Sequence, residues 1–554
     1  MDICPLYGHL PVTQLPRTFS FECRDYNTAI VTREKIEDAR CLAVIALRVP
    51  QPEDNEGSNV SQNAAVNSNT FPSGRPVVFR NATVLTIDPE LGMVENGDVL
   101  VVDDRIAAVG HQLAAPDGAV EIDASDGILM PGMVDTHRHM WQTALRGFGA
   151  DWTLTNYFQF YYLNWGKIFR PEDIYAGNLL SAIEAIDSGV TTTVDWSHGL
   201  QTVDYADAAV DALEAVPGRF VLAYGNLLGA PWQWTKAPEF ADFIRRRIDG
   251  RGDRLRMQIA FDVTGDPAFP EKAAFEVARE FNLPVTTHAG VWGVTKDISI
   301  KMMYDHGFMT PSTIYVHAAT LSDDSYQRIA ATGGHASVSA ESEMNAGQGY
   351  PPTWQLRRHR IPVSLSMDTS VWWSADLFSA MRATLNADRG REHLEAHKRD
   401  ETVMLSHLRA EQVVNWATMG GAEALGMDSL IGSITPGKKA DLVLIKNEQS
   451  PAMFPLLHPY GHVVFQAGRG DVHTVMVDGN VVKYDHQLIG ADLNKAKQAV
   501  AKTVEYARDK MGEQAWNQSM NPEKAVVELI ENPYLYTKQE KQGNSGAAPA
   551  ASQE

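Results

Sequence analysis

The 554-residue sequence is poor in cysteine and has no long apolar run. Its three cysteines, Cys4, Cys23 and Cys41, form an odd and sparse set that suits a reducing compartment better than a disulfide framework. All three precede the motifs described below, which excludes zinc fingers and other thiolate metal sites. No apolar stretch approaches the roughly 18 to 20 residues that span a bilayer, and the first residues lack the basic start and apolar core of a secretory signal. We therefore expect a cytoplasmic protein.

Positive charge is also scarce, because 48 lysines and arginines stand against 69 aspartates and glutamates, which gives a net charge of −21. Such a charge repels phosphates and so argues against nucleic acid or an anionic membrane surface as the main partner. The length is sufficient for a barrel-sized domain and a smaller companion. A small molecule is thus the expected partner, and a homo-oligomer is left open.

The two ends of the chain differ from its middle in composition and in the periodicity of their apolar residues. Residues 1–75 show no clear period and end in a polar stretch rich in Asn, Ser and Gly, which predicts a partly disordered N-terminal extension. Residues 76–128 read as short strands separated by Gly and Asp turns. Residues 431–486 return to short strands and complete this β domain, although a separate C-terminal β module fits almost as well. Residues 487–554 predict a helix followed by a low-complexity, disordered tail.

The middle of the chain, residues 129–430, alternates strand-like and helix-like segments, which favours βα units and a parallel sheet. The candidate strands are 128–139, 189–198, 219–228, 254–263, 283–290, 313–320, 334–341 and 361–368. Eight such units predict an α/β fold built on a (β/α)₈ TIM barrel, with a small β-sandwich domain formed from the segments before and after it. In a barrel of this kind the polar residues that end the strands converge on one face, where active sites lie.

The first barrel strand ends in a His-x-His pair within LMPGMVDTHRHMWQTALRG. Residues two apart on a strand face the same side, so His137 and His139 can grip one metal ion while Arg138 points the other way. A lone pair of this kind is more often two ordinary histidines. The strand-five and strand-six segments, however, end in His288 and His317.

The strand-eight segment adds a carboxylate, Asp368, to these imidazoles. Three imidazoles and a carboxylate are a sound set for one divalent ion with an open position for water. Zinc is the expected ion, with iron and manganese as alternatives. The coincidence at several strand ends favours a metal site over separate core histidines.

The order of these motifs resembles a known family. A β segment precedes PGMVDTHRHMWQ, and TTHAG, VHAATLSDD, LSMDTS and the closing PGKKADLVLI with VMVDGNVV follow it. Over about residues 76–485 this order resembles the amidohydrolase superfamily, and most closely its mononuclear aminohydrolases, similar to cytosine, guanine and 8-oxoguanine deaminases and chlorotriazine hydrolases. No Lys or Glu stands in the strand-four segment RLRMQIAFDV to bridge two metals, which favours one ion.

The resemblance implies a role for each motif residue. The metal ligands it implies are His137, His139, His288 and Asp368. His317 would contact the substrate or the attacking water. Gln142 has the spacing seen in purine deaminases of this family, where the amide binds the heterocycle, and a Gln amide both donates and accepts hydrogen bonds; the alternative is a helix-start polar residue. Apart from the resemblance, the tryptophans near the rim would suit stacking on a flat ring, although tryptophan is mostly a core residue; they are Trp141, Trp152, Trp196, Trp292, Trp372 and Trp373.

Two departures from the family pattern stand out. Relatives carry a proton-shuttling Glu three residues after the strand-five histidine, whereas this chain has Val291. Relatives show a His-Cys-Pro run at strand seven, where this chain has residues 339–344, SAESEM. Glu341 and Glu343 point the same way if the strand persists, so one of them would carry the missing proton. The alternative is that both are exposed loop carboxylates.

The expected reaction is hydrolysis of a C–N bond by a metal-activated water, with Asp368 passing the proton to the leaving group. The substrate class is a small heterocycle, either a ring amidine that is deaminated or a cyclic amide that is opened. One alternative is a hydrolase that acts on an exocyclic amide, a carbamate, a urea or a halide. Another is a metal-retaining binding protein with weak activity.

Overall fold

The computed structural model describes residues 18–23, 26–32, 71, 74–291 and 297–523. The chain divides into two compact units, Met1–Ala65 and Val66–Glu554. In the first unit, β1 (Thr18–Cys23) pairs antiparallel with β2 (Tyr26–Thr32). This hairpin was not predicted, although its β-branched and aromatic residues favour strands.

The centre of the second unit is a sheet of eight parallel strands that pair in chain order. These strands are β8 (Met133–Arg138), β9 (Val190–Ser197), β10 (Arg219–Tyr224), β11 (Leu255–Ala260), β12 (Val285–Ala289), β13 (Ile314–His317), β14 (His335–Val338) and β15 (Val363–Leu365). The last strand returns to the first, because the Asp368 N–H donates to His137 O at 3.0 Å and the His139 N–H donates to Asp368 O at 2.7 Å. The predicted (β/α)₈ barrel is confirmed.

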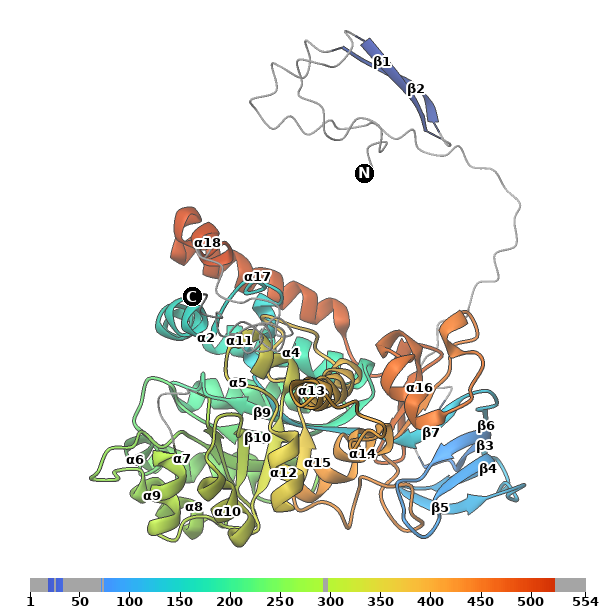
Figure 1. Ribbon diagram of the computed structural model, residues 1–554, viewed down its shortest axis with the longest axis horizontal. Coiled ribbons are helices and arrows are strands. Elements are labelled where there is room, and N and C mark those ends of the chain that lie inside the picture. Colours follow the sequence, from blue (N-terminus) through green and yellow to red (C-terminus); the bar gives the residue numbers. More distant parts are fainter. Residues whose placement is uncertain (1–17, 24–25, 33–70, 72–73, 292–296, 524–554) are drawn as a thin grey trace, which may run out of the picture. The chain divides into compact units, whose positions relative to one another are not determined.

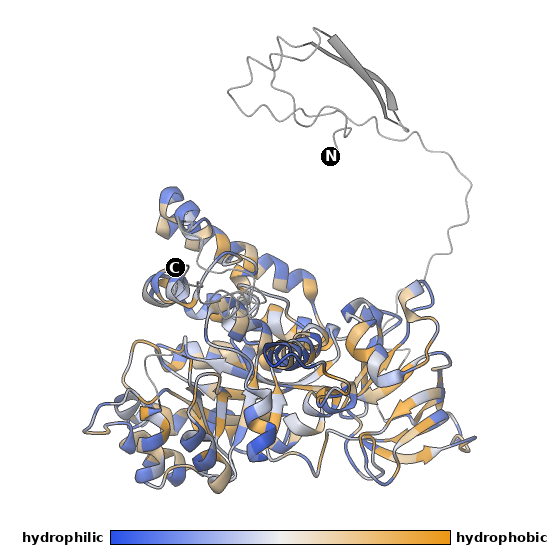
Figure 2. Ribbon diagram, viewed as in Figure 1, coloured by the Kyte–Doolittle hydropathy of each residue, from blue (hydrophilic) through white to orange (hydrophobic). Residues whose placement is uncertain are grey.

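Helices cover the outside of this barrel (Figure 1). They include α4 (Pro171–Asp187), α5 (Val203–Glu214), α7 (Pro238–Phe243), α8 (Lys272–Glu280), α9 (Ile298–Asp305), α10 (Asp323–Thr332), α12 (Thr353–His359), α13 (Leu377–Lys398), α14 (Ala410–Trp416) and α15 (Met419–Ala424). In α5 the buried residues Ala206, Ala209, Val210 and Leu213 recur at the spacing of one helix face. Hydrophilic and hydrophobic residues alternate along these helices (Figure 2). Within the described ranges no helix is long and apolar enough to cross a membrane, and the cytoplasmic location stays a prediction.

The β domain is one mixed sheet, formed by chain segments that precede and follow the barrel in the sequence (Figure 1). Its strands are β3 (Val77–Leu85), β4 (Met93–Val102), β5 (Arg105–Gly110), β6 (Val120–Asp123), β7 (Ile128–Pro131), β16 (Leu442–Ile445), β17 (Val472–Val477), β18 (Asn480–Tyr484) and β19 (Gln487–Leu488). Strand β7 pairs with β3 and also with β16, which joins the segment before the barrel to the segment after it. The alternative of a separate C-terminal β module is therefore wrong.

The predicted strand 128–139 is two strands in the structure. Strand β7 belongs to the mixed sheet and β8 to the barrel, and Gly132 is the joint between them. A Cβ at Gly132 would lie 2.1 Å from Thr191 Oγ1, so only glycine allows the close approach. A continuous apolar run hides this joint, because burial on both sides of the glycine looks the same in sequence.

Two further contacts tie the second unit together. The buried guanidinium of Arg219 on β10 donates to Asp441, beside β16, through two hydrogen bonds of 3.1 Å. At the C-terminal end, α17 (Leu493–Met511) occupies the helix-prone run and α18 (Glu513–Met520) follows it. Trp516 of α18 packs against Phe148 and Trp165, with ring centroids 4.8 and 5.7 Å away. The C-terminal helices thus support the segment that follows β8.

Candidate functional site

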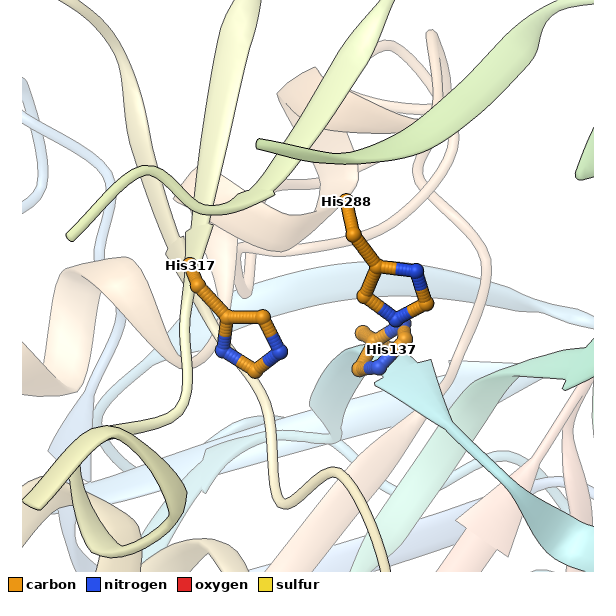
Figure 3. A group of neighbouring side chains, drawn as sticks. All are labelled: His137, His288 and His317. Carbon is orange, nitrogen blue, oxygen red and sulfur yellow. The ribbon is translucent and has the colours of Figure 1, made fainter. Parts of the chain in front are cut away.

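The strand-end residues singled out in the sequence lie together in the barrel. His137 Nε2 and His139 Nε2 lie 3.2 and 3.3 Å from the same atom, Asp368 Oδ1. The rings of His288, on β12, and His317, on β13, lie with centroids 5.0 and 5.6 Å from that of His137. Figure 3 shows the three rings of His137, His288 and His317 turned toward a common space. Arg138 points away and donates to Ser181 and Glu184 on α4, as predicted for the opposite face of the strand.

Neighbouring groups fix which nitrogen of each ring faces the cluster. His139 Nδ1 lies 2.8 Å from the Trp196 carbonyl oxygen, and His288 Nδ1 lies 3.1 Å from Asp262 Oδ1. These contacts leave Nε2 of both rings toward the cluster, in the arrangement usual for metal-binding histidines. The ligand-type atoms of His137, His139 and Asp368 all lie within 4.8 Å of one another, as do those of His137, His288 and His317. This spacing fits a single divalent ion.

The protonation states of His137, His139 and Asp368 also suit a cation, whereas at His288 the carboxylate of Asp262 outweighs burial and raises the pKa. Burial lowers the pKa of His137 well below its ordinary value and that of His139 to about 4, so both rings are neutral at pH 7. Burial alone would raise the pKa of the Asp368 carboxyl, but His137 and His139 outweigh it and hold this pKa well below the ordinary value. Neutral imidazoles and an ionised carboxylate are the forms that bind divalent metals.

Backbone strain accompanies the cluster at two strand ends. His317 and Asp368 have φ angles of 70° and 63°, in the left-handed region that residues other than glycine rarely adopt. Such conformations cost of order 1 kcal/mol or more and persist where the surroundings impose them, often at functional sites. Here they occur where both side chains turn into the cluster.

Gln142 and Trp141 do not reach the pocket, contrary to the roles predicted for them. After His139 the chain turns into η2 (Met140–Leu145), which buries both side chains. Gln142 Nε2 donates to Tyr157 OH at 2.6 Å, and its Oε1 accepts from Thr369 Oγ1 at 2.8 Å. Trp141 is a core residue that donates from Nε1 to His198 Nδ1 at 3.4 Å. The amide of Gln142 therefore positions two residues of the pocket wall.

The two glutamates of the unusual strand-seven segment have different surroundings. The strand ends at Val338 and α11 (Ala340–Ala346) begins, so residues two apart no longer point the same way. Glu343 is fully buried, lies 3.4 Å from His317 Nδ1 through Oε1, and accepts the Ser339 N–H at 2.8 Å. Glu341 is half-buried and accepts a 2.6 Å hydrogen bond from Ser374. The predicted common orientation is wrong, and Glu343 alone of the two contacts a residue of the cluster.

A narrow cavity of about 80 Å³ opens onto the cluster. Beside the cluster it is lined by Leu154, Tyr157, Phe158, Trp196, His198, Asp262, Val291, Gln348, Thr369 and Trp372. Trp372 stacks on Trp373 with ring centroids 4.7 Å apart and planes 2° apart. Val291 thus takes a place in the pocket wall, and Trp292 lies outside the described residues. An aromatic wall beside a few polar groups suits a flat heterocycle.

Three polar residues of this wall that were missed in the sequence, among others, are His198, Asp262 and Gln348. His198 and Asp262 end the strand-two and strand-four segments, so the rule of converging strand ends applied to them as well. His198 lies beside His139, with ring centroids 4.4 Å apart, and Asp262 orients His288. Gln348 lies in a loop, where no periodic pattern marks it.

Comparison with known proteins places the chain among hydrolases. Residues 128–482 match the Amidohydrolase family. The 5'-deoxyadenosine deaminase of Methanosarcina mazei is 28% identical over 443 residues, which cover 77% of this chain and 98% of that protein. The 5-methylthioadenosine/S-adenosylhomocysteine deaminase of Symbiobacterium thermophilum is 30% identical over 428 residues, which cover 74% of this chain and 94% of that protein.

Solved structures share the fold. An adenosine deaminase from Xanthomonas campestris with bound zinc superposes with a TM-score of 0.67 at 21% identity, covering 79% of this chain and all of that one. A zinc complex of atrazine chlorohydrolase from Arthrobacter aurescens gives 0.66 at 20% identity, covering 78% and 100%. The prediction of an enzyme that acts on carbon–nitrogen bonds is confirmed by the family and its deaminase relatives. Since the match extends over more than half of its length, the chain belongs to the amidohydrolase family.

Proposed function

We propose that this metal-dependent hydrolase removes an amino group from an adenine-type heterocycle. The observation that carries the proposal is the convergence of His137, His139, His288 and Asp368 beside a narrow aromatic pocket. Deaminases of adenosine derivatives among the relatives support the substrate class. At about 28% to 30% identity these relatives leave the substituent on the ring open.

In this proposal the residues that hold the ion are His137, His139, His288 and Asp368. The bound zinc in the Xanthomonas and Arthrobacter structures supports zinc as the ion, with iron and manganese as alternatives. A divalent ion held there supplies Lewis acidity, which makes water nucleophilic near neutral pH and polarises the group under attack.

Proton movement falls to residues of this chain. Asp368 takes a proton from the attacking water and delivers it to the leaving nitrogen, and Ser342 Oγ fixes this carboxylate by donating to Oδ2 at 2.5 Å. Glu343 Oε1 lies 3.4 Å from Nδ1 of His317 and holds this ring so that its other edge faces the substrate. Glu341 takes no part in the reaction. Trp196 and Trp372 stack on the ring.

A second candidate activity is displacement of a halide or alkoxide at the same ring carbon. The observation that favours it is Val291, an apolar residue in the pocket wall that cannot protonate a leaving amine. General acid catalysis is typically worth 10²–10⁴-fold, so a better leaving group would offset its loss.

The test is a release assay on zinc-loaded enzyme with adenine, adenosine, 5'-deoxyadenosine, 5'-methylthioadenosine, cytosine, guanine and a chlorotriazine. We expect ammonia from at least one adenine-type compound, and loss of nearly all activity in Asp368→Asn. The matched control is Glu341→Gln, which retains the rate. Chloride release alone would favour the second candidate. Retained metal without any turnover would favour the binding protein and overturn the proposal.

A further inference from the structure

We propose that Gln348 recognises the substrate through its carboxamide oxygen, which accepts a hydrogen bond from an N–H group of the bound heterocycle. In the same arrangement its NH₂ group donates to Ser342 and so helps to hold Asp368. This inference rests on the proposed function, because it names the N–H group by which the pocket would recognise the proposed heterocyclic substrate. The recognised group is an exocyclic amine or a ring N–H.

Two glycines bring Gln348 to the pocket wall. It follows α11 and stands between Gly347 and Gly349, whose φ angles of +79° and +133° favour glycine. A Cβ at Gly349 would lie 2.8 Å from Ala319 Cβ and from Thr320 Cγ2, so the loop packs closely against the segment after β13. Gln348 is only 5% exposed and lines the cavity. Its position is therefore built by the local backbone.

The hydrogen count at Ser342 sets the orientation of the amide. Ser342 Oγ lies 2.8 Å from the amide atom of Gln348 that is placed as Oε1, and 2.5 Å from Asp368 Oδ2. A hydroxyl has one hydrogen, and an ionised carboxylate only accepts, so that hydrogen goes to Asp368. Ser342 Oγ must then accept from Gln348, and only the NH₂ group can donate. Since the N and O of an amide are assigned from their partners, the nitrogen faces Ser342 and the oxygen faces the pocket.

The pocket-facing oxygen is available to a ligand. Among the described residues, no hydrogen bond is made by the amide atom of Gln348 that points away from Ser342. Gln142 offers a contrast, because both of its amide atoms are used by Tyr157 and Thr369. An acceptor in the pocket that loses its water without gaining a donor is costly, and a substrate N–H satisfies it.

Substrate choice follows from this acceptor. A site built to bond an N–H group rejects an analogue that lacks it, because the acceptor is then left unpaired. We expect roughly a 10-fold to 100-fold preference for an amino group over a methoxy group at the same ring carbon. Stacking on the aromatic wall is the same for the amino and the methoxy compound, so a preference between them reports the hydrogen bond to Gln348.

The probes are 5'-deoxyadenosine and its analogue with methoxy in place of the 6-amino group. Zinc-loaded full-length wild type, Gln348→Leu and Gln348→Glu are compared by kcat and KM where turnover occurs, and by calorimetric dissociation constants where it does not. Gln355→Leu is the control, since Gln355 lies on α12 and accepts from Arg391 instead of lining the cavity. Thermal melting confirms that each variant folds.

We expect the affinity of Gln348→Leu for the amino probe to fall 10-fold or more and its affinity for the methoxy probe to stay unchanged. Gln348→Glu retains the acceptor, so it keeps the amino preference. Both variants lose kcat, because neither side chain can donate to Ser342. Equal losses of affinity for both probes, no loss of affinity for either, or wild type that binds neither probe would each overturn the inference. Binding with the expected preference but without ammonia release would overturn only the proposed deamination.

Discussion

Replacing Glu343 by Gln tests whether this carboxylate positions His317 in an enzyme that has Val291 where its relatives have a proton-shuttling Glu. Glu343 is fully buried and touches His317 Nδ1, so it acts on the substrate only by positioning that ring. Gln keeps the size and can still accept from the Ser339 N–H, but the charge is lost. Hydrogen bonds to charged groups contribute about 1.5–3 kcal/mol. The contact of 3.4 Å is long, which places the expected loss near the lower end, about 10-fold to 30-fold in kcat/KM.

Although Glu343→Gln should lower activity, it should not lower the stability of the fold. Burial raises the pKa of Glu343 above its ordinary value despite His317, so the ionised form is less favourable in the folded than in the unfolded chain. A raised carboxyl pKa gives stability that is present at low pH and is lost as the pH rises through the folded value. The neutral Gln avoids this loss, and we expect Tm at pH 7 to stay equal or to rise.

The assay compares kcat, KM and Tm of Glu343→Gln with those of Glu341→Gln. Glu341 stands on the same helix, accepts a hydrogen bond from Ser374 and makes no hydrogen bond or ion pair with His317 within the described residues, so the change in its rate is expected to stay within about twofold. Equal losses in both variants, or a Glu343→Gln enzyme with the wild-type rate, would refute the positioning role.

Three further predictions concern the frame around the site. Arg219→Met leaves Asp441 buried without its cation and should lower the free energy of unfolding by about 3–5 kcal/mol in urea titrations, whereas Arg246→Ala, at an exposed pair, should cost under about 1 kcal/mol. Trp516→Ala removes the contacts of α18 with Phe148 and should cost about 3–5 kcal/mol and raise KM; an unchanged KM would show that α18 does not support the pocket. A chain that begins at residue 66 should keep its metal and activity, and loss of either would assign residues 1–65 a part in the site.

The truncation point differs from the predicted extension of residues 1–75 for a structural reason. Phe71 packs against Tyr484 with ring centroids 4.8 Å apart, and Arg75 donates from Nε to Gly118 O at 2.8 Å. Both contacts join distant parts of the β domain, which a local polar pattern does not reveal.

Features that recur along the sequence are predicted well. Apolar runs that each end in a polar residue predict the barrel, and they place His137, His288 and Asp368 together because parallel strands share one end. The helix at Glu343 was missed because SAESEM has no clear period, and a short segment after a strand can continue it or turn. The burial of Gln142 was missed because the spacing of a motif says nothing about which side chains complete its hydrogen bonds. Gln348 depends on glycine backbone angles and a contact with the loop after β13, neither of which is local.

The most direct test of the single-metal centre is the metal content of the purified protein by elemental analysis. We predict about one divalent ion per chain in wild type and almost none in the His137→Ala/His139→Ala double variant, because two of the four proposed ligands are then gone. The variants Glu343→Gln and Gln348→Leu should keep about one ion, since neither residue is a proposed ligand. Two ions per chain in wild type, or full occupancy in the double variant, would contradict the account.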